Sequence, residues 1–261
     1  RFVSNFKTSN VESMSYMFYY CPLIEILDIS SFETDYLKDT SFMFVSCGKI
    51  SSLNFRNFHT QNVISMEDMF LSCTSLTSLD LSNFDTSKVL KMDNMFSYCK
   101  ELRYLDISNF DTSLLTSMRS MFSATSSLRS LDISNFDTSK VTNMNGMFLE
   151  SGLTSLDLSN FDTKELQDMG FMFSHMYSLI SLNLGNFNTS KVTYMSYLFL
   201  QCTSLEHLDV SSFETKLVEN MYAMFENCQK LTSIDVSRFE TGEVSSLGNM
   251  FKDCVSLKSV N

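Results

Sequence analysis

The apolar and polar residues of this chain repeat in one fixed order along its whole length. A phenylalanine recurs every 26 residues, with one step of 25, and a second phenylalanine follows each of them twelve positions later. A threonine lies two positions after the first phenylalanine in all ten units, from Thr8 to Thr241. The first phenylalanines are Phe6, Phe32, Phe58, Phe84, Phe110, Phe136, Phe161, Phe187, Phe213 and Phe239. Such a repeat indicates a solenoid whose units bury their apolar faces against one another.

Two periodicities divide each unit, as residues 76–99 illustrate. Residues 78–82 alternate polar and apolar side chains, which predicts a half-buried strand. The apolar residues of 89–96 are spaced three, three and one positions apart, which predicts one face of a short helix. Residues 85–87 carry the oxygens that cap helix N-termini, so we expect the threonine of each unit to be a helix cap. The single short step, before Leu153, predicts a turn that has lost one residue at little cost.

Stacking ten such strand–turn–helix units predicts an α/β solenoid with one parallel sheet on one side and short helices on the other. Strands about 4.8 Å apart give ten units a length of roughly 50 Å. We expect one solenoid domain over residues 1–261. Repeat arrays need atypical units with polar outer faces at their ends, and neither end of this sequence has one. We therefore expect this chain to be part of a longer protein, or its two ends to contact other subunits head to tail.

The order of residues within the repeat resembles a known family. Residues 76–99 match the pattern L-x-x-L-D-L-S-N-F-D-T-S-x-V-x-x-M-x-x-M-F-x-x-C. This pattern resembles the BspA-like leucine-rich repeat surface proteins, and more narrowly their 26-residue class found in mycoplasmas, lactic acid bacteria and some protists. The resemblance covers the whole chain. It implies a right-handed solenoid of the leucine-rich-repeat type, in a secreted or surface-displayed, non-enzymatic protein used in adhesion or recognition.

Composition and charge exclude several classes of function. The chain has 30 acidic and 19 basic residues and a net charge of −11, which argues against nucleic acid as a partner, because phosphate binding needs clustered Lys and Arg. No apolar run approaches the ~18 residues of a membrane span. No secretory signal pattern opens the sequence.

The seven cysteines all occupy one repeat position, three residues after the second phenylalanine. Three other units have Thr125, Ser151 and Met176 there. A disulfide framework would show varied spacings, and a zinc site would bring C-x-x-C pairs or histidines. We therefore expect a column of buried free thiols. Its members are Cys21, Cys47, Cys73, Cys99, Cys202, Cys228 and Cys254.

A column of acidic residues runs along the predicted outer face of the sheet. If Leu79 and Leu81 point inward, Ser78, Asp80 and Ser82 point outward. The column reads Asp28, Asn54, Asp80, Asp106, Asp132, Asp157, Asn183, Asp209 and Asp235. One interpretation is a calcium-dependent surface, but calcium gathers six to eight oxygens around one ion. The favoured interpretation is a solvated polar face on which each Asp is bonded to a Ser, without a metal or cofactor.

Departures from the repeat mark candidate partner-binding residues on this face. Tyr104 and His207 replace Ser in one column, and Arg56 replaces Ser beside Asn54. Exposed aromatic and basic residues suit a partner's hot spot, although drift in a tolerant array would produce them too. The candidate set is Ile26, Asn54, Arg56, Tyr104, Asn183, Gly185 and His207, with Asp80, Asp106, Asp132, Asp157 and Asp209.

A second set of aromatic residues lies on the predicted helix side. Partly exposed rings there would meet protein or sugar, or else pack between successive helices. They are Tyr16, Phe42, Phe171, Tyr197 and Tyr222, with Tyr19, Tyr20 and Tyr98 near the following turn.

The sequence shows no catalytic arrangement. His59, His175 and His207 occupy three different repeat positions, and we expect all three to face outward. His207 and Asp209 are two apart on a strand, about 7 Å along the chain, too far for the relay that activates a nucleophile. We therefore predict a protein that is not an enzyme.

Three functions follow from these patterns. The first is an extracellular or cell-surface scaffold that recognises a host or neighbour-cell protein or glycan, without nucleic acid and without a membrane-spanning segment. The alternative is a structural assembly element, a filament or surface layer built by self-association of the uncapped ends. A flat ice or mineral binder is disfavoured by the carboxylates.

Overall fold

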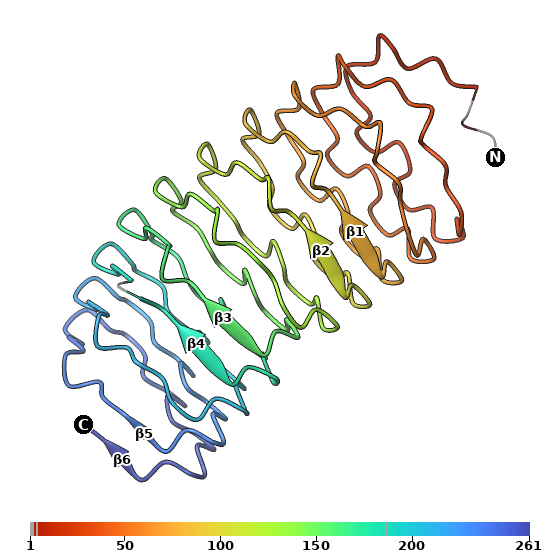
Figure 1. Ribbon diagram of the computed structural model, residues 1–261. Helices are drawn as coiled ribbons and strands as arrows, with labels where there is room; N and C mark the ends of the chain where they lie inside the picture. The colour runs from red at the N-terminus through yellow and green to blue at the C-terminus, as the bar shows by residue number, and fades with distance from the viewer. Residues whose placement is uncertain (1–2, 4, 186) are drawn as a thin grey trace.

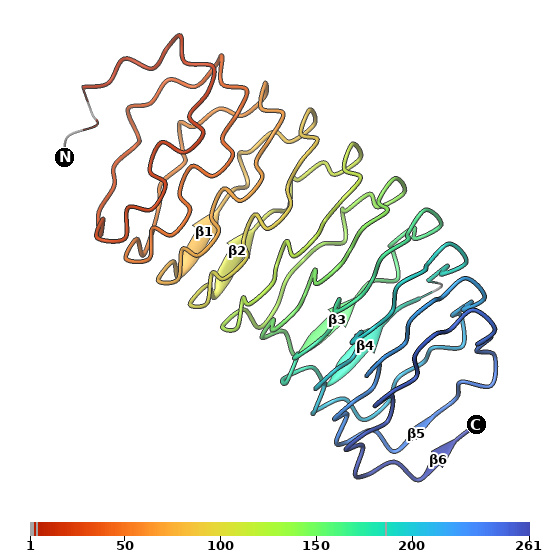
Figure 2. The ribbon, with the colours of Figure 1, turned by 180° about the vertical axis from the view of Figure 1, so that it is seen from behind.

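The computed structural model describes residues 3, 5–185 and 187–261. The chain winds into a row of similar coils stacked side by side, with its two ends at opposite ends of the row (Figure 1). The view from behind shows the same stacking along the other side (Figure 2). The predicted repeat solenoid is confirmed.

Short parallel strands form one side of the coils. They pair as β1 with β2, β3 with β4 and β5 with β6, each residue facing the residue 26 positions later. The single continuous sheet that we predicted is thus replaced, in the described residues, by three two-stranded pieces in line. The strands are β1 (Ser78–Asp80), β2 (Tyr104–Asp106), β3 (Ser155–Asp157), β4 (Ser181–Asn183), β5 (Ser233–Ile234) and β6 (Ser259–Val260).

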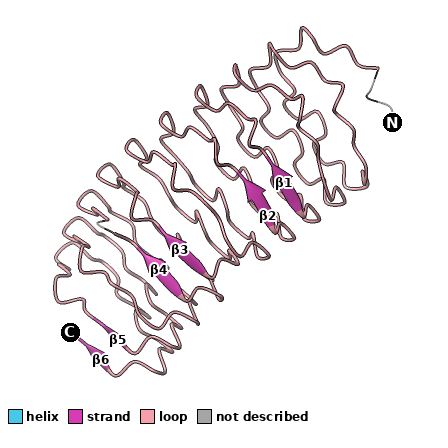
Figure 3. Cartoon of the chain, in the orientation of Figure 1, coloured by secondary structure: helices cyan, strands magenta, loops and turns pink. Residues whose placement is uncertain are grey.

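The predicted helices need correction, because the described residues contain no helix (Figure 3). Each segment expected to be helical instead forms consecutive tight turns. Isolated parallel bridges join these segments from coil to coil, along Ser13, Asp39, Ser65 and Lys91, and again along Ser117, Asn143, Asp168, Tyr194, Asn220 and Ser246. The units are therefore strand and turn units, and the α/β class is wrong in its helical part. None of the described segments is a helix that would cross a bilayer.

Hydrogen bonds between coils explain why turns replace the helix. The Phe42 amide donates to the Glu67 carbonyl of the next coil at 2.9 Å, whereas the Met43 amide donates back to the Thr40 carbonyl at 3.2 Å. Amides therefore alternate between the next coil and a local bond that spans three residues. A helix would direct every amide along its own axis and leave none for the neighbouring coil. The turns bury the same apolar residues that a helix would.

This alternation places many residues in the left-handed backbone region. Phe42 has φ of 61° and Ser46 has φ of 59°, and the same two positions recur in the other coils. Among the described residues, nineteen other than glycine have a positive φ, a conformation that costs about 1 kcal/mol for an L-residue. The hydrogen bonds that each turn makes to both neighbouring coils offset this cost.

The threonine of each repeat joins neighbouring coils and does not cap a helix. Thr112 Oγ1 donates to the main-chain carbonyl of Asp137 at 2.9 Å and accepts the Asp137 amide at 2.8 Å. Thr60 and Thr86 make the same two bonds to Asp85 and Asp111. The helix-cap prediction is wrong for a simple reason. The hydroxyl satisfies a donor and an acceptor 25 residues ahead, which only the stacking of coils brings within reach.

Phenylalanine rings form a continuous stack through the core. From Phe18 to Phe251 each second phenylalanine stacks on that of the next coil, with centroids 5.4–6.1 Å apart and planes within 10°. Leu79 and Leu81 are buried on the strand side of this stack, and Val63 and Met66 on the turn side. The core therefore separates a sheet face, with outward residues equivalent to Ser78, Asp80 and Ser82, from a turn face that carries the isolated bridges.

The cysteines are free thiols, as predicted, and those of the inner coils are buried. Each buried Sγ donates to the carbonyl of the second phenylalanine of the preceding coil, as Cys73 does to Phe44 at 3.2 Å. Burial raises the pKa of Cys99 to about 12. Such a thiol stays protonated and acts as a small apolar side chain.

Gly152 closes the coil that is one residue short. Its amide donates to the Thr125 carbonyl at 3.1 Å and its carbonyl accepts from the Arg129 guanidinium at 2.7 Å. A Cβ atom at this position would lie 2.1 Å from the Ser126 carbonyl oxygen. The shortened turn is tolerated because glycine lets the two backbones approach.

Candidate functional site

Each aspartate of the sheet-face column is bonded within its own coil. Asp106 Oδ1 accepts the Ser108 hydroxyl at 2.7 Å and the Ser108 amide at 3.1 Å. The same pair of bonds forms at Asp80 and Asp132. The Ser108 hydroxyl and amide bonds hold the pKa of Asp106 below its usual range, and equivalent bonds lower the pKa of Asp132, Asp157 and Asp209. The predicted bonds between each Asp and a Ser of its own coil are therefore present.

These carboxylates stay spread along the column. In register, Asp80 faces Asp106 on the next strand and Asp157 faces Asn183. Among the described residues, no three His, Cys, Asp or Glu side chains gather in a way that suits a metal ion. The face therefore presents a row of negative charges to solvent.

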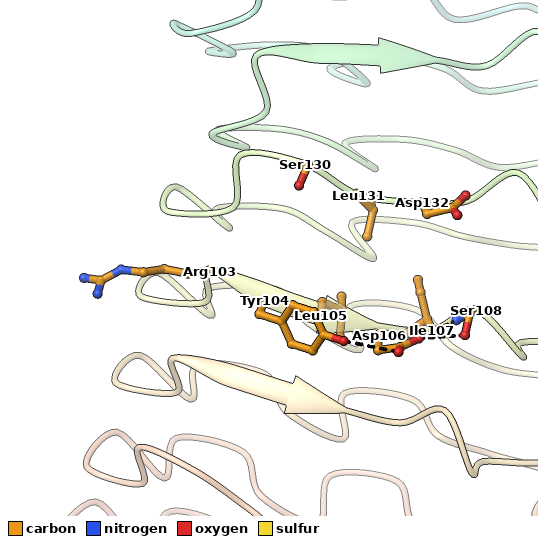
Figure 4. A pocket seen from close by; sticks show the side chains of 9 residues that line it. All are labelled: Arg103, Tyr104, Leu105, Asp106, Ile107, Ser108, Ser130, Leu131 and Asp132. Carbon is orange, nitrogen blue, oxygen red and sulfur yellow. Dashed lines mark hydrogen bonds between the residues drawn. The ribbon is translucent and has the colours of Figure 1, made fainter.

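Tyr104 stands in a shallow depression of the sheet face, of about 510 Å³ (Figure 4). Its side chain is 55% exposed, and its hydroxyl donates to Asp106 Oδ2 at 3.3 Å. The Asp106 carboxylate raises the pKa of this hydroxyl, so it remains a donor. Residues of two coils line the depression: Arg103, Tyr104, Leu105, Asp106, Ile107, Ser108, Ser130, Leu131 and Asp132.

Arg103 is the residue of this depression that sequence reasoning missed. Its guanidinium pairs with Glu101 at 3.1 Å, and both side chains are largely exposed. Figure 4 shows it extending away from the strand beside Tyr104. The repeat pattern carries no clear signal for it, because this repeat position varies and is Thr77 in the preceding coil but Arg129 in the next. Its guanidinium adds hydrogen-bond donors to a depression that already holds the Tyr104 ring and the carboxylates of Asp106 and Asp132.

Arg56 lines a second depression, of about 380 Å³, two coils before Tyr104. Its amide donates to Asn54 Oδ1 at 3.0 Å, and Asp80 and Ser82 of the next coil complete the wall. Because Asp80 lies opposite Asp106 in the β1–β2 pair, the two depressions adjoin. The structure therefore brings Asn54, Arg56, Asp80, Tyr104, Asp106 and Asp132 into one strip of neighbouring coils. With Arg103, these residues form what we call the Arg56–Tyr104 strip.

Ile26 lies at the N-terminal side of this strip. It is almost fully exposed and lines a depression of about 350 Å³ together with Asp28 and Asn54. It extends the strip by one coil and adds an apolar contact to it.

Two of the predicted residues have local structural roles. Asn183 Nδ2 donates to Asp157 Oδ1 at 3.0 Å, which links two coils. Gly185 has φ of 53°, and a Cβ there would lie 2.7 Å from the Ser159 Cα. Glycine is therefore required at 185 by backbone conformation and close approach.

His207 is exposed in the same column as Tyr104, four coils further along. At about 4.8 Å per coil the two side chains are roughly 19 Å apart. Only a partner with an extended footprint would contact both.

The other histidines have close polar partners but no catalytic geometry. His59 Nδ1 lies 2.7 Å from Asp35 Oδ1 of the preceding coil, with both side chains exposed. His175 is half-buried, contrary to expectation, and its Nδ1 lies 2.7 Å from the Ser174 hydroxyl. Ser174 is completely buried, so it offers no nucleophile to a substrate.

Comparison with known proteins gives one match to a family and several to solved structures. The structures include a leucine-rich repeat protein from Bacteroides ovatus, 17% identical, with TM-score 0.31 over 94% of this chain and 80% of that one. A leucine rich cell surface protein from Faecalibacterium prausnitzii is 16% identical, with TM-score 0.44 over 94% and 75%. A leucine-rich repeat protein from Eubacterium ventriosum is 15% identical, with TM-score 0.37 over 82% and 78%. Among curated proteins nothing matches.

The family match spans the repeat array. Residues 1–101, 72–179 and 174–260 each match the family described as "Mycoplasma protein of unknown function, DUF285". Together they cover almost the whole chain. The chain therefore belongs to the DUF285 family, and its assignment to the BspA-like leucine-rich repeat class is confirmed.

Proposed function

We propose that this chain is a non-enzymatic recognition scaffold that acts at the cell surface or outside the cell and binds a partner protein through the Arg56–Tyr104 strip. The family, a repeat family of the BspA-like class, supports a protein-interaction scaffold. Adhesion to a host or neighbouring cell is the role that suits such a scaffold.

The observation that carries the proposal is the Tyr104 depression. Elsewhere the strand position of Tyr104 is mostly Ser, as at Ser78 and Ser130. Here an aromatic ring, an arginine and two carboxylates line one hollow of about 510 Å³. Tyrosine and arginine are, with tryptophan, the residues enriched among those that dominate the energy of protein interfaces. The flanking Asp–Ser pairs supply a polar rim in which each carboxylate is held in place by its Ser.

The partner is expected to be basic where it meets this strip. Asp80, Asp106 and Asp132 carry charge that their Ser partners stabilise. Complementary charge on a partner speeds association and fixes its register. Added salt should therefore slow binding.

A binding screen of immobilised extracellular-matrix proteins and glycans tests the proposal. Tyr104→Ser restores the residue of the neighbouring coils, so the fold should be retained and circular dichroism unchanged. We expect binding to the partner to weaken at least about 30-fold, which corresponds to the ~2 kcal/mol of an interface hot spot. Tyr177→Ser, at a similarly exposed tyrosine outside the strip, is the matched control. Equal binding by Tyr104→Ser and the parent would remove this strip from consideration.

Two further arms define the site. His207→Ser measures the footprint, since it weakens binding only if the partner spans four coils. Partner affinity is also measured with calcium and with a chelator, because a column of carboxylates could attract a cation. We expect the same affinity in both, since each of these carboxylates is already bonded to its own Ser.

A further inference from the structure

The turn face of the first coils carries an apolar hollow, apart from the Arg56–Tyr104 strip. Tyr16 and Phe42 stack with centroids 4.6 Å apart and planes at 8°. Together with Ile64 and Leu90, from the next two coils, these rings line a hollow. The hollow has a volume of about 350 Å³ and also contacts Ser15, Asp39, Ser41, Ser65, Glu67 and Lys91. We call it the turn-face hollow.

Its apolar residues are not needed by the core. Tyr16 is 54% exposed, Ile64 47% and Leu90 52%. The position of Ile64 and Leu90 is polar in the other coils, where it is Glu12, Lys38, Thr116, Thr142, Gln167, Thr193, Glu219 and Ser245. Aliphatic side chains have thus been placed next to one another, at solvent, only in the two coils that face the Tyr16–Phe42 pair. Grouped apolar exposure of this kind marks a contact surface.

The surroundings of the hollow are acidic. Asp39 and Glu67 line it, and Asp68 and Asp93 follow on the adjoining turns. Asp68 is only 7% exposed, and within the described chain its Oδ1 has no hydrogen-bond partner. Lys91 lies 3.8 Å from Glu67, so it offsets one of these charges. A surplus of negative charge remains around an apolar hollow.

We propose that the turn-face hollow binds an extended peptide segment of a partner in which an aliphatic side chain is flanked by Lys or Arg. The aliphatic side chain enters the hollow, and the flanking cations meet Asp39 and Glu67. The volume suits one or two side chains. A glycan fits less well, because the Tyr16 and Phe42 rings stack on each other and Ile64 and Leu90 offer no aromatic face to a sugar.

The main chain beneath the hollow is already paired. Asp39 bridges Ser13 and Ser65, and Ser65 bridges Lys91. The peptide therefore binds through its side chains and adds no strand to the coil. This site goes beyond the proposed function, because it lies on the opposite side of the core from Tyr104.

Fluorescence anisotropy with a labelled ten-residue peptide of alternating Leu and Lys tests the proposal. Two comparison peptides replace Lys by Glu or Leu by Ser. We expect saturable binding of the Leu–Lys peptide and at least tenfold weaker binding of the other two. Binding of all three alike, or of none at millimolar protein, would overturn the proposal.

Variants of the chain assign the binding to the hollow. The double variant Ile64→Thr and Leu90→Thr carries the residue found at this position in Thr116, so its fold should be kept. We expect at least a tenfold loss of affinity, because the variant loses the apolar surface that Ile64 and Leu90 offer to the peptide. Leu217→Thr, at an equally exposed leucine elsewhere, should bind as the parent does. A double variant within twofold of the parent would place the peptide elsewhere and refute the proposal.

Charge and the sheet face supply the remaining arms. Glu67→Gln should weaken binding several-fold at low salt and less at high salt, because screening reduces the lost attraction. Tyr104→Ser should leave peptide binding unchanged. Failure of the peptide experiment therefore leaves the sheet-face proposal standing, and failure of the sheet-face experiment leaves this one standing.

Discussion

Replacing Thr112 by valine tests whether the threonine column holds the coils together. Valine has nearly the same shape as threonine but cannot form the two bonds to the main chain of Asp137, at 2.9 and 2.8 Å. Thr112 is buried, so the carbonyl and amide of Asp137 would lose their partner where water enters poorly. Leaving a buried polar group unpaired costs about 1–3 kcal/mol. We expect Thr112→Val to lower the free energy of unfolding by about 2–4 kcal/mol.

Serine at the same position separates the contribution of the threonine hydroxyl to stability from that of its methyl group. Thr112→Ser keeps both hydrogen bonds and loses one buried methyl, worth about 1 kcal/mol. The valine variant should therefore be the less stable of the two by about 1–3 kcal/mol. Thr142→Val is the control, because its hydroxyl bond to the Thr116 carbonyl is exposed and its loss should change stability by less than about 0.5 kcal/mol.

Urea unfolding followed by circular dichroism measures the global effect. Since a stacked array opens locally before it unfolds, hydrogen exchange at the Asp137 amide gives the direct readout. We expect that amide to exchange faster in Thr112→Val and at nearly the parent rate in Thr112→Ser. If valine is as stable as serine and the Asp137 amide stays protected, the coil-to-coil role of the threonines is refuted.

Three further predictions concern single positions. Gly152→Ala should destabilise the fold by about 3 kcal/mol, because the alanine Cβ would lie 2.1 Å from the Ser126 carbonyl oxygen and the backbone would have to shift. An unchanged urea unfolding curve would contradict this. Burial raises the pKa of Asp68 from 3.8 to about 6, so the folded chain binds that proton more tightly than the unfolded chain, and stability falls as the pH rises from about 4 to 6. Asp68→Asn should therefore raise the free energy of unfolding by about 2 kcal/mol at pH 7 and change it little below pH 4, and equal effects at both pH values would exclude this cause. In the native protein a thiol reagent should modify half-buried Cys254 before Cys99, whose pKa burial raises to about 12, and mass spectrometry of the labelled peptides would show the reverse order if the column were open to solvent.

The repeat pattern was enough to decide which residues lie inside and which lie outside. Leu79, Leu81 and Phe84 are buried as expected, and so is Cys99. This prediction succeeded even though the expected helix is absent, because turns that bond every three residues and a helix of 3.6 residues bury nearly the same positions. The outward Asp–Ser pairs were also predictable, because an Asp at the end of a strand bonds the amide and hydroxyl of the Ser two residues later in a local turn.

Only the stacking of coils decided how the backbone of each unit is bonded. A helix was the better local choice for residues 89–96, but the next coil offers acceptors such as the Glu67 carbonyl that faces the Phe42 amide. The role of Thr112 and the His59–Asp35 pair depend on the same alignment of residues about 25 apart. Contacts of that kind follow from the offset between neighbouring coils, which no short window of sequence specifies. The Tyr104 depression and the turn-face hollow also depend on this alignment, because each combines side chains from successive coils.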